Sequence, residues 1–519
     1  MEVLEDHLVS SLLRESDRLH TEINQIIEEA TTGDGGESRA AALLPEDVLL
    51  LDHARRIALV ENPDIHAARA RLAAAMAGVA EARSRFFPSL IATHTSTRTF
   101  HTPASRNRLN LALQPLQPVP TDTSTDNIVV TTVVNALRLP FFGGNAARGD
   151  SSPFSEHSSS LTLAWTVFDG FVRDNELLSS QHLQNASVMS AANVERVLIR
   201  AVDRAYYQVQ LAREQLRVAR ADERFSRNQL RETQKLRDAQ RATAADVGNF
   251  EVRLRRAQVN VTTAIGARDT GRVALAELMG VADVALPEGL ALSPLADETE
   301  AIMTLPFVDD WIDDALENRP DIAELKHVVE SRANGVRAAK GLYSPLVQVS
   351  GSWGFDRTSN VKYSVEDQSS AAGIEFQWDL FTGGARRARV LQAQSAWAEA
   401  AAHLKRLRLA VQSEVTTALI ELKKAQEQIR LQRKNLETAG ENRRVIEEAY
   451  RAGKETLTRL NEAQRDFVAA DADLAFARIR LRQAWSALYA AAGAYRDNMN
   501  GGAEQAGEGN GTGESGGGG

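Results

Sequence analysis

The segment Leu163-Ala164-Trp165-Thr166-Val167-Phe168-Asp169-Gly170 returns 213 residues later as Phe376-Gln377-Trp378-Asp379-Leu380-Phe381-Thr382-Gly383. A second motif, Asn62-Pro63-Asp64-Ile65, returns after 257 residues as Arg319-Pro320-Asp321-Ile322, and Pro88 and Pro345 share that offset. Motifs that recur in the same order indicate an internal duplication. Because the offset falls from 257 to 213, the first copy carries 44 extra residues between Pro88 and Trp165. Their Ser, Thr, Asn and Pro content predicts an exposed loop.

Each copy has the same predicted order of elements: a helix that begins at the proline, a pair of strands around a loop, and two long helices. The strands are rich in β-branched and aromatic residues. In the second strand of the second copy, the last apolar residues alternate with polar ones. The chain is predicted to begin with an N-terminal extension (1–45) and to end in a disordered Gly-rich tail (496–519). The first repeat (46–300) contains strands at about 89–100 and 160–169, a loop insertion (101–158) between them, and a helical hairpin (171–282). The second repeat (301–495) contains strands at about 346–356 and 372–381 and a helical hairpin (385–493).

The two hairpins are predicted to be coiled coils. Residues 172–237 contain neither proline nor glycine, and 385–451 contain only Gly440. Apolar residues fall on heptad spacing, with alanines three residues behind them that allow close helix packing. These residues are Val202, Val209, Leu216 and Leu230 with Ala205, Ala212 and Ala219, and in the second copy Val415, Leu422 and Ile429 with Ala418 and Ala425. About 65 residues of helix span roughly 100 Å.

The composition excludes several classes of protein. The net charge of -9 over 519 residues gives no basic footprint, so we expect no nucleic-acid partner. The absence of cysteine removes thiolate metal sites, disulfides and thiol nucleophiles, and no P-loop, metal or nucleophile motif appears. We therefore expect no enzyme, no cofactor, no metal site and no catalytic residue.

Membrane signals in the sequence are limited. No run approaches the roughly 18 to 20 apolar residues of a membrane-spanning helix. The first residues, Met1 to His7, are acidic and lack the basic and apolar regions of a secretory signal, so either a signal is missing from this sequence or the protein is not exported.

The predicted strands need partners outside their own repeat. A single strand pair is marginal in water, and four strands from one chain leave exposed edges. If several copies pool their strands, a closed barrel results, with apolar residues toward lipid and a polar lumen. Strands of about ten residues match the length of a tilted membrane strand.

Taken together, the repeated motifs resemble those of the TolC family of outer-membrane efflux proteins. The resemblance covers about residues 46–495 and rests on the paired proline motifs, the two Trp-x-x-Phe motifs before Gly170 and Gly383, and Tyr450-x-x-Gly453. It implies a mostly α protein with a small β part, in which a homotrimer forms an α-barrel tunnel continuous with a β-barrel. The implied role is an outer-membrane channel of a tripartite efflux or type I secretion system, with its helices in the periplasm. The implied partners are a periplasmic adaptor, an inner-membrane transporter and outer-membrane lipid.

In the family the hairpin turns form the periplasmic entrance, where an Asp of the first copy bonds an Arg of the second. Asp246 matches that Asp, but Glu455 stands where the gating Arg is expected. Arg459 replaces the first of two acidic constriction residues, and Glu462 retains the second. We therefore expect a rewired latch in which Asp246 pairs with Arg459 or Lys454. The predicted entrance residues are Asp246, Arg451, Lys454, Glu455, Arg459 and Glu462.

Simpler interpretations compete with each of these roles. Thr243 and Asp246 also have the spacing of a capping box at the start of a helix. Trp165 and Trp378 are either aromatic-belt residues or packing between strand and helix, and their equal positions favour a shared structural role. We expect Pro88, Gly170, Pro345 and Gly383 to form structural turns beside them. As whole-protein alternatives, a soluble coiled-coil scaffold or a periplasmic adaptor would also contain long hairpins.

Overall fold

The computed structural model describes residues 21, 44–45, 47–99, 154–240, 243–281, 284–294, 298–305, 308–358, 362–452 and 454–493. Most of the predicted N-terminal extension, residues 100–153 of the insertion, Gly453 and the Gly-rich tail therefore lie outside the described residues. The chain divides into two compact units. One comprises the described parts of Met1–Ser84, Phe171–Leu342 and Thr382–Gly519, and the other comprises those of Arg85–Gly170 and Tyr343–Phe381. Each repeat thus contributes to both units.

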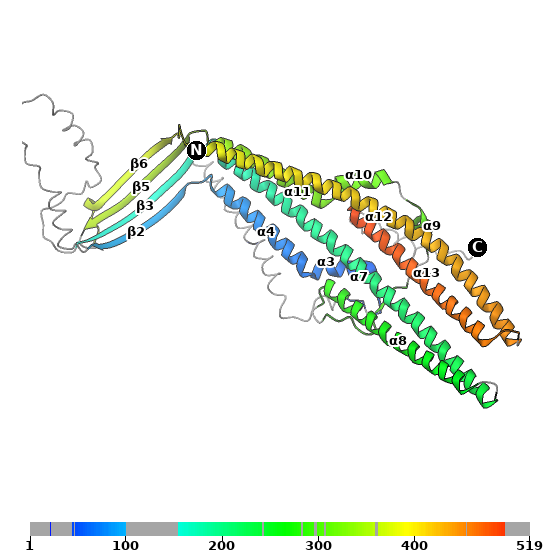
Figure 1. Cartoon of the computed structure of the whole chain (residues 1–519). Coiled ribbons are helices and arrows are strands. Elements are labelled where there is room, and N and C mark those ends of the chain that lie inside the picture. The colour runs from blue at the N-terminus through cyan, green and yellow to red at the C-terminus, as the bar shows by residue number, and fades with distance from the viewer. Residues whose placement is uncertain are drawn as a thin grey trace, which may run out of the picture. The chain divides into compact units, whose positions relative to one another are not determined.

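The second unit is a four-stranded antiparallel sheet in the order β2-β3-β5-β6 (Figure 1). Its strands are β2 (Ser89–Thr99), β3 (Phe154–Phe168), β5 (Leu346–Thr358) and β6 (Gln368–Gln377), with a short 3-10 helix, η2 (Val365–Asp367), before β6. Each repeat supplies one antiparallel pair, and β3 joins β5 across the two repeats.

Two predicted strand boundaries were wrong. The strand expected at 160–169 begins at Phe154, so residues 154–158 of the expected loop belong to the sheet. Their serine-rich composition is typical of loops, but cross-strand pairing with β2 overrides local preference. The strand expected at 372–381 lies at Gln368–Gln377 instead. Gln377 pairs with Leu346, the first residue of β5, so Trp378 to Phe381 have no continuing strand beside them.

The helical unit contains two hairpins of matching length. The first is α7 (Val172–Asp238) with α8 (Ala244–Leu278), and the second is α12 (Ala385–Arg451) with α13 (Leu457–Ala492). Both α7 and α12 have 67 residues and begin 213 residues apart. The predicted heptad positions line these hairpins: Val202, Val415, Leu422 and Ile429 are fully buried. The helix α12 continues through Gly440, where a Cβ atom would lie 3.4 Å from Phe467 Cε2.

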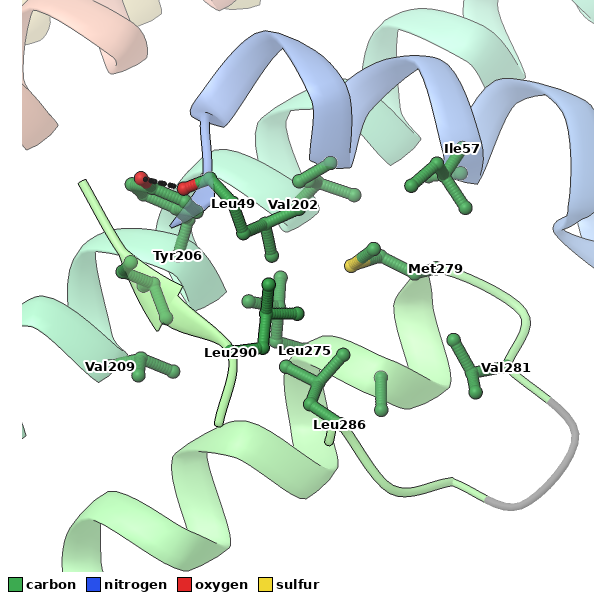
Figure 2. Packing of buried hydrophobic residues seen from close by; sticks show 14 of the residues in the cluster. Leu49, Ile57, Val202, Tyr206, Val209, Leu275, Met279, Val281, Leu286 and Leu290 are labelled. Atoms are coloured by element: carbon green, nitrogen blue, oxygen red, sulfur yellow. Dashed lines mark hydrogen bonds between the residues drawn. The ribbon is translucent and has the colours of Figure 1, made fainter. Parts of the chain in front are cut away.

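Shorter elements complete each copy. The helices α4 (Pro63–Ser84) and α11 (Pro320–Gly341) begin at the repeated prolines, where a missing N–H group costs nothing. The helices α3 (Leu51–Glu61) and α10 (Val308–Asn318), the four-residue α9 (Glu300–Met303) and the parallel pair β1 (Val48–Leu49) and β4 (Ala291–Leu292) were not predicted. Figure 2 shows the core that β1, β4 and α3 form with α7 and α8 around Leu49, Met279 and Leu290, in which the Tyr206 hydroxyl donates to the Leu49 carbonyl. The helices α9 and α10 pack instead in a second core with α12 and α13.

The end of each returning helix is held by the residue before the repeated proline. In the first copy Asn62 Nδ2 donates to the Leu278 carbonyl at 2.9 Å. In the second copy Arg319 Nη1 donates to the Ala491 carbonyl at 2.8 Å. These donors are 257 residues apart and their acceptors 213, so the two clamps are repeat equivalents. Both satisfy a carbonyl that the helix end leaves unpaired.

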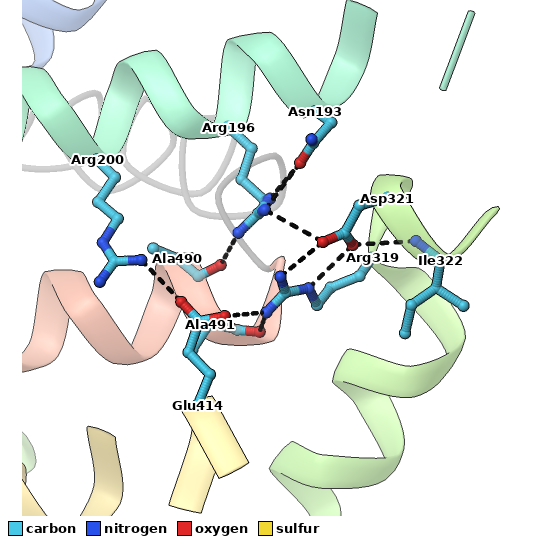
Figure 3. A network of polar contacts seen from close by, with 9 residues as sticks. All are labelled: Asn193, Arg196, Arg200, Arg319, Asp321, Ile322, Glu414, Ala490 and Ala491. Atoms are coloured by element: carbon cyan, nitrogen blue, oxygen red, sulfur yellow. Dashed lines mark hydrogen bonds and ion pairs between the residues drawn. The ribbon is translucent and has the colours of Figure 1, made fainter. Parts of the chain in front are cut away.

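The second clamp belongs to a charged network (Figure 3). Arg319 also forms a two-pronged contact with Asp321 and donates to Glu414 Oε2 at 2.8 Å. Arg196 of α7 donates to the Ala490 carbonyl, and Arg200 pairs with the other oxygen of Glu414. The network therefore connects α7 of the first repeat with α11, α12 and α13 of the second.

Among the described residues, no helix combines the length and apolar character needed to cross a membrane.

Candidate functional site: an amphipathic sheet and two hairpin tips

One face of the four-stranded sheet is apolar. Directly paired residues of neighbouring strands point to the same side, and side chains alternate along each strand. The register therefore places Leu163 beside Leu90, Trp165 beside Val349, and Val349 beside Ile374. The members of this apolar face are Leu90, Leu161, Leu163, Trp165, Val347, Val349, Trp353, Phe355, Ile374 and Phe376. Ile374 is 76% exposed and Phe376 64% exposed, so large apolar side chains face outward from the sheet.

The opposite face is mostly polar, with apolar exceptions such as Ile91 and Leu346. The same pairings align Thr162 with Ser352, Thr166 with Gln348, and Gln348 with Glu375. Thr93, Thr95 and Thr97 of β2 lie on this face beside Ser160, Ser158 and Glu156 of β3. A sheet with one apolar and one polar face has the pattern of an outer-membrane barrel, in which the apolar face meets lipid and the polar face meets water. Gly354 allows this pairing, because a Cβ atom there would lie 2.6 Å from the Ser159 carbonyl oxygen.

Both outer strands have an open edge. Within the described residues, β2 pairs only with β3 and β6 pairs only with β5. Their backbone groups on the outer side are available for further strands, which soluble proteins normally avoid. Because each neighbouring pair is antiparallel, β2 and β6 run in opposite directions. A copy of β2 placed beside β6 would therefore continue the antiparallel order.

The repeated tryptophans have a shared structural contact. Trp165 Nε1 donates to the Phe86 carbonyl at 3.0 Å, and Trp378 Nε1 donates to the Tyr343 carbonyl at 3.1 Å. Phe86 and Tyr343 each stand two residues before the repeated prolines, Pro88 and Pro345. Each indole therefore ties the end of one strand to the turn that starts the other strand of its pair. Both rings remain partly exposed, which also suits an aromatic belt.

Glycines mark the exit from each strand pair. Gly170 has a φ of 73°, and Gly383 and Gly384 have φ values of 60° and 88°. Gly170 and Gly383 are repeat equivalents, and left-handed backbone favours glycine. Phe171, the residue before α7, also adopts a positive φ. The backbone therefore turns sharply before each long helix.

The tip of the first hairpin has a capping box, which confirms the simpler interpretation of Asp246. The Asp246 carboxylate accepts from the Thr243 backbone N–H at 2.9 Å and from its hydroxyl at 2.7 Å, while Thr243 Oγ1 accepts from the Asp246 N–H. The bond from the Thr243 backbone, with help from the hydroxyl, lowers the pKa of Asp246 below its ordinary value. Asp246 therefore carries its charge at neutral pH.

The tip of the second hairpin lacks this carboxylate. Thr456 Oγ1 again accepts from the backbone three residues later, but that residue is Arg459. Arg459 lies 3.8 Å from Glu462, and both side chains are largely exposed. The Lys454 backbone bonds the Ala449 carbonyl, Glu455 is exposed, and Arg451 ends α12. Among the described residues of one chain, Asp246 has no ion pair with Lys454 or Arg459.

Exposed apolar stripes on the outer helices were missed at the sequence level. Val252, Val259 and Val273 of α8 follow seven-residue spacing through Gly266, and each is about half or more exposed. On α12, Leu409, Ile420 and Leu431 recur every eleven residues and are also exposed. Heptad spacing alone could have located the α8 stripe. Assigning it to an outer surface required knowing which face packs on α7.

Comparison with known proteins gives the family. A model of the outer membrane efflux protein family matches residues 54–281 and 311–494. Protein CyaE of Bordetella pertussis is 28% identical over 69% of this chain and 78% of its own length. Alkaline protease secretion protein AprF of Pseudomonas aeruginosa is 27% identical over 47% of this chain and 51% of its own length. The outer-membrane channel OprN has the same fold, with a TM-score of 0.68, 21% identity, and coverage of 89% of this chain and 97% of that chain.

The chain belongs to the outer membrane efflux protein family, as the repeated motifs predicted. It is an outer-membrane channel protein, and its helical part lies in the periplasm. The predicted fold class, a mostly helical tandem repeat with a small sheet, is confirmed. The alternatives of a soluble scaffold and a periplasmic adaptor are excluded by the family.

Proposed function

We propose that three copies of this chain form the outer-membrane exit duct of a tripartite efflux or type I secretion system. The observation that carries the proposal is the sheet with two unlike faces and two open edges. Joining β6 of one copy to β2 of the next closes the sheet with lipid-facing and lumen-facing surfaces. The duct catalyses no reaction and needs no cofactor or metal.

The width needed for a water-filled lumen favours three copies over two. Two copies would give eight strands, and such a barrel has an interior that side chains nearly fill. Three copies give twelve strands, an even number that keeps every pair antiparallel. The polar face of Ser, Thr, Gln and Glu side chains suits the water-filled lumen of this wider barrel.

The helical unit supports the same assembly. The helix α7 packs between α8 and α13, and α12 packs against α13. The exposed stripes of α8 and α12 thus lie on the two outer helices of a layer with the order α8-α7-α13-α12. Pairing α8 of one copy with α12 of the next buries both stripes.

Repeat equivalence indicates which stripe residues meet. Gly271 of α8 lies against Val209 of α7, because a Cβ atom there would be 3.3 Å from Val209 Cγ2. The repeat equivalent of Val209 is Leu422 of α12. Val273 and Ile420 therefore lie at nearly the same level along the hairpins.

Cross-linking tests the trimer sharply, because the chain has no cysteine of its own. We expect Val273→Cys combined with Ile420→Cys to yield covalent trimers on oxidation of outer membranes. Val273→Cys combined with Leu391→Cys is the control, because Leu391 is equally exposed but lies 29 residues, roughly 40 Å, further along α12. Covalent dimers as the largest product, or equal yields from both pairs, would contradict the trimer.

The partners are a periplasmic adaptor and an inner-membrane transporter, with outer-membrane lipid around the barrel and no nucleic acid. Of the cargo classes, protein secretion has the support of AprF, whose name records secretion of an alkaline protease. Co-purification from cross-linked cells, followed by identification of the transporter, distinguishes secretion from efflux of small molecules.

The hairpin tips form the gate of this duct. Asp246 and Arg459 are repeat equivalents of opposite charge, so a ring of hairpins brings them together between copies or between repeats. Asp246 then pairs with Arg459 or Lys454, and Glu462 gives the entrance a negative charge, with Arg451 and Glu455 beside it. Exposed pairs contribute about 0 to 1 kcal/mol each, which adaptor binding can overcome.

Conductance in planar bilayers tests the gate. We expect Asp246→Ala and Arg459→Ala trimers to conduct more than the unaltered protein, while the exchange Asp246→Arg with Arg459→Asp restores the low conductance. Glu462→Gln should reduce the preference for cations without opening the gate. Unchanged current in both alanine variants would overturn the latch and leave the trimer untouched.

A further inference from the structure

The ionisable side chains of the four strands are separated by face. His94, Arg98, His157 and Arg357 lie on the apolar face, because Arg357 pairs with His157, His157 pairs with Ser96, and His94 and Arg98 stand two residues from Ser96. Glu156, Asp356 and Glu375 lie on the polar face. These seven are all the Asp, Glu, Lys, Arg and His residues within the four described strands. Basic groups thus occupy the face that meets lipid.

The basic residues gather at one end of the apolar face. Ser159 pairs with both His94 and Phe355, and His157 with Arg357 forms the next rung on the same face. Successive residues on one face are about 7 Å apart, so the basic residues lie within roughly 14 Å of the Phe355 rung, measured along the strands. Aromatic residues lie between the aliphatic residues and three of the four basic ones: Trp353 and Phe355 meet edge-on at 5.0 Å, and Phe355 lies 5.5 Å from Tyr363. His94 stands on the rung of Phe355 itself.

Hydroxyl groups hold the two histidine rings. His94 Nδ1 bonds Ser159 Oγ, and His157 Nδ1 bonds Ser96 Oγ, each at 2.8 Å. These bonds occupy Nδ1, so a ligand would meet Nε2 of each ring. Arg357 Nη1 pairs with Asp367 of η2 at 2.8 Å, which offsets part of its charge.

This end of the sheet faces away from the helical connections. The helix α4 precedes the first residue of β2, and α7 follows the last residue of β3, whereas Thr99 and Phe154 flank the 54-residue insertion. Because the helical part lies in the periplasm, the basic end belongs to the outer leaflet. An apolar band, an aromatic rim and a row of basic residues follow the order of acyl chains, interface and phosphates in a lipid layer.

We propose that His94, Arg98, His157 and Arg357 form a basic collar that binds the phosphate groups of the outer-leaflet lipid, a phosphorylated lipid A. The inference rests on the proposed function, since it needs the apolar face to contact lipid. Arginine forks match phosphate oxygens. Within the described strands all three carboxylates lie on the opposite face, and Arg357 also pairs with Asp367 of η2.

Vesicle binding tests the collar. Purified trimers are reconstituted into phosphatidylcholine vesicles that contain either bisphosphorylated lipid A or the same lipid A after removal of its phosphates, and lipid retained after detergent extraction is counted per trimer. We expect the unaltered protein to prefer the phosphorylated form, and Arg98→Gln with Arg357→Gln to reduce that preference roughly tenfold or more. His94→Gln with His157→Gln should reduce it less.

Two controls keep the result specific. Glu156→Gln with Asp356→Asn changes charge at the same level on the opposite face and should leave the preference intact. Arg98→Lys with Arg357→Lys keeps the charge and should retain most of it. Equal retention of both lipids by a trimer that still conducts would overturn the collar alone. Failure to conduct in either vesicle would overturn the proposed channel as well.

Discussion

The two repeats have equivalent hydrogen bonds at both ends of their hairpins, but the residues that form these bonds differ in charge. At the returning helix end, neutral Asn62 clamps the first copy and charged Arg319 clamps the second. At the tip, acidic Asp246 completes the first cap, while basic Arg459 stands at the same position in the second. The two copies therefore share the positions of these hydrogen bonds but not the charges of the residues that make them.

This difference in charge makes the second repeat depend more than the first on contacts with neighbouring helices. An amide that bonds one carbonyl can be lost at modest cost, since no charge is left behind. A guanidinium that serves two carboxylates and a carbonyl cannot, because its removal leaves carboxylates short of a partner away from water. The second copy is thus coupled to α7 through Arg196 and Arg200, whereas the Asn62 clamp bonds only Leu278 and its own helix start.

The largest effect is expected from removing the charged clamp. The Arg319 side chain is 4% exposed, so Arg319→Met should lower the free energy of unfolding by about 3 to 5 kcal/mol, the usual cost of breaking a buried ion pair. Asn62→Ala should cost only about 1 to 2 kcal/mol, because the hydrogen bonds lost to the Leu278 carbonyl and the Asp64 N–H are neutral and leave no unpaired charge. Urea unfolding followed by circular dichroism measures both. Equal losses in the two variants would show that the networks contribute alike.

Glycine at the helix ends gives a second, smaller contrast. Gly280 and Gly493 are repeat equivalents with φ values of 72° and 80°. A Cβ atom on Gly280 would lie 2.6 Å from the Glu61 carbonyl oxygen, whereas one on Gly493 would lie 3.1 Å from the flexible Arg319 Cγ. We expect Gly493→Ala to cost about 1 to 2 kcal/mol from the left-handed backbone alone. Gly280→Ala should cost more, as thermal melting would reveal, and the reverse order would contradict the packing described at these ends.

Acid should weaken the charged Arg319 clamp of the second repeat at a higher pH than the neutral Asn62 clamp of the first. Burial alone would raise the pKa values of Asp321 and Glu414, but hydrogen bonds and charge from Arg319 hold both below their ordinary values of 3.8 and 4.5. A folded-state pKa below the unfolded one contributes stability above the ordinary values, and this contribution disappears as pH falls through the folded pKa.

Stability should therefore be level from about pH 7 to pH 5 and decline below about pH 4.5. Arg319→Met should flatten this decline, since it removes the largest of the interactions that lower the two pKa values and leaves only smaller contributions, among them those of Arg196 and Arg200. Asn62→Ala should lower stability by the same amount at every pH and leave the shape of the profile unchanged. Fluorescence of Trp311 and Trp485, which pack around Tyr489 in the second copy, follows the transition. An identical acid decline in Arg319→Met would show that other carboxylates cause it.

Much of the fold was predictable because each sequence motif occurs twice, once in each copy. The prolines at positions 63 and 320 start helices, and the heptads from Val202 and Val415 define buried seams. The strand limits were less predictable. Residues Ser155 to Ser158 look like a loop in isolation and become a strand only because β2 and β5 lie on either side. Trp378 fits the alternating pattern and leaves the sheet because β5 ends beside it.

Some features of the candidate site could likewise be predicted from the sequence, and others could not. Strand alternation indicated two unlike faces, but the separation of Arg98 and His157 from Glu156 emerges only from the cross-strand register. The capping role of Asp246 was readable from its spacing to Thr243, since both groups belong to one turn. Pairing between Asp246 and Arg459 depends on groups 213 residues apart and on neighbouring copies, so spacing alone cannot decide it.

The smallest effect concerns the two tips. Arg459→Asp gives Thr456 the acidic third residue that Thr243 already has, and so should complete a capping box at the start of α13. Asp246→Asn should weaken the first box, since the amide accepts less strongly from the Thr243 N–H. We expect slower amide exchange at residues 456–460 in the first variant and faster exchange at 243–247 in the second, with global stability unchanged. Because a cap acts within one turn, exchange in the middle of α7 is the internal control, and a change there would mean that the tips influence the hairpin beyond their own caps.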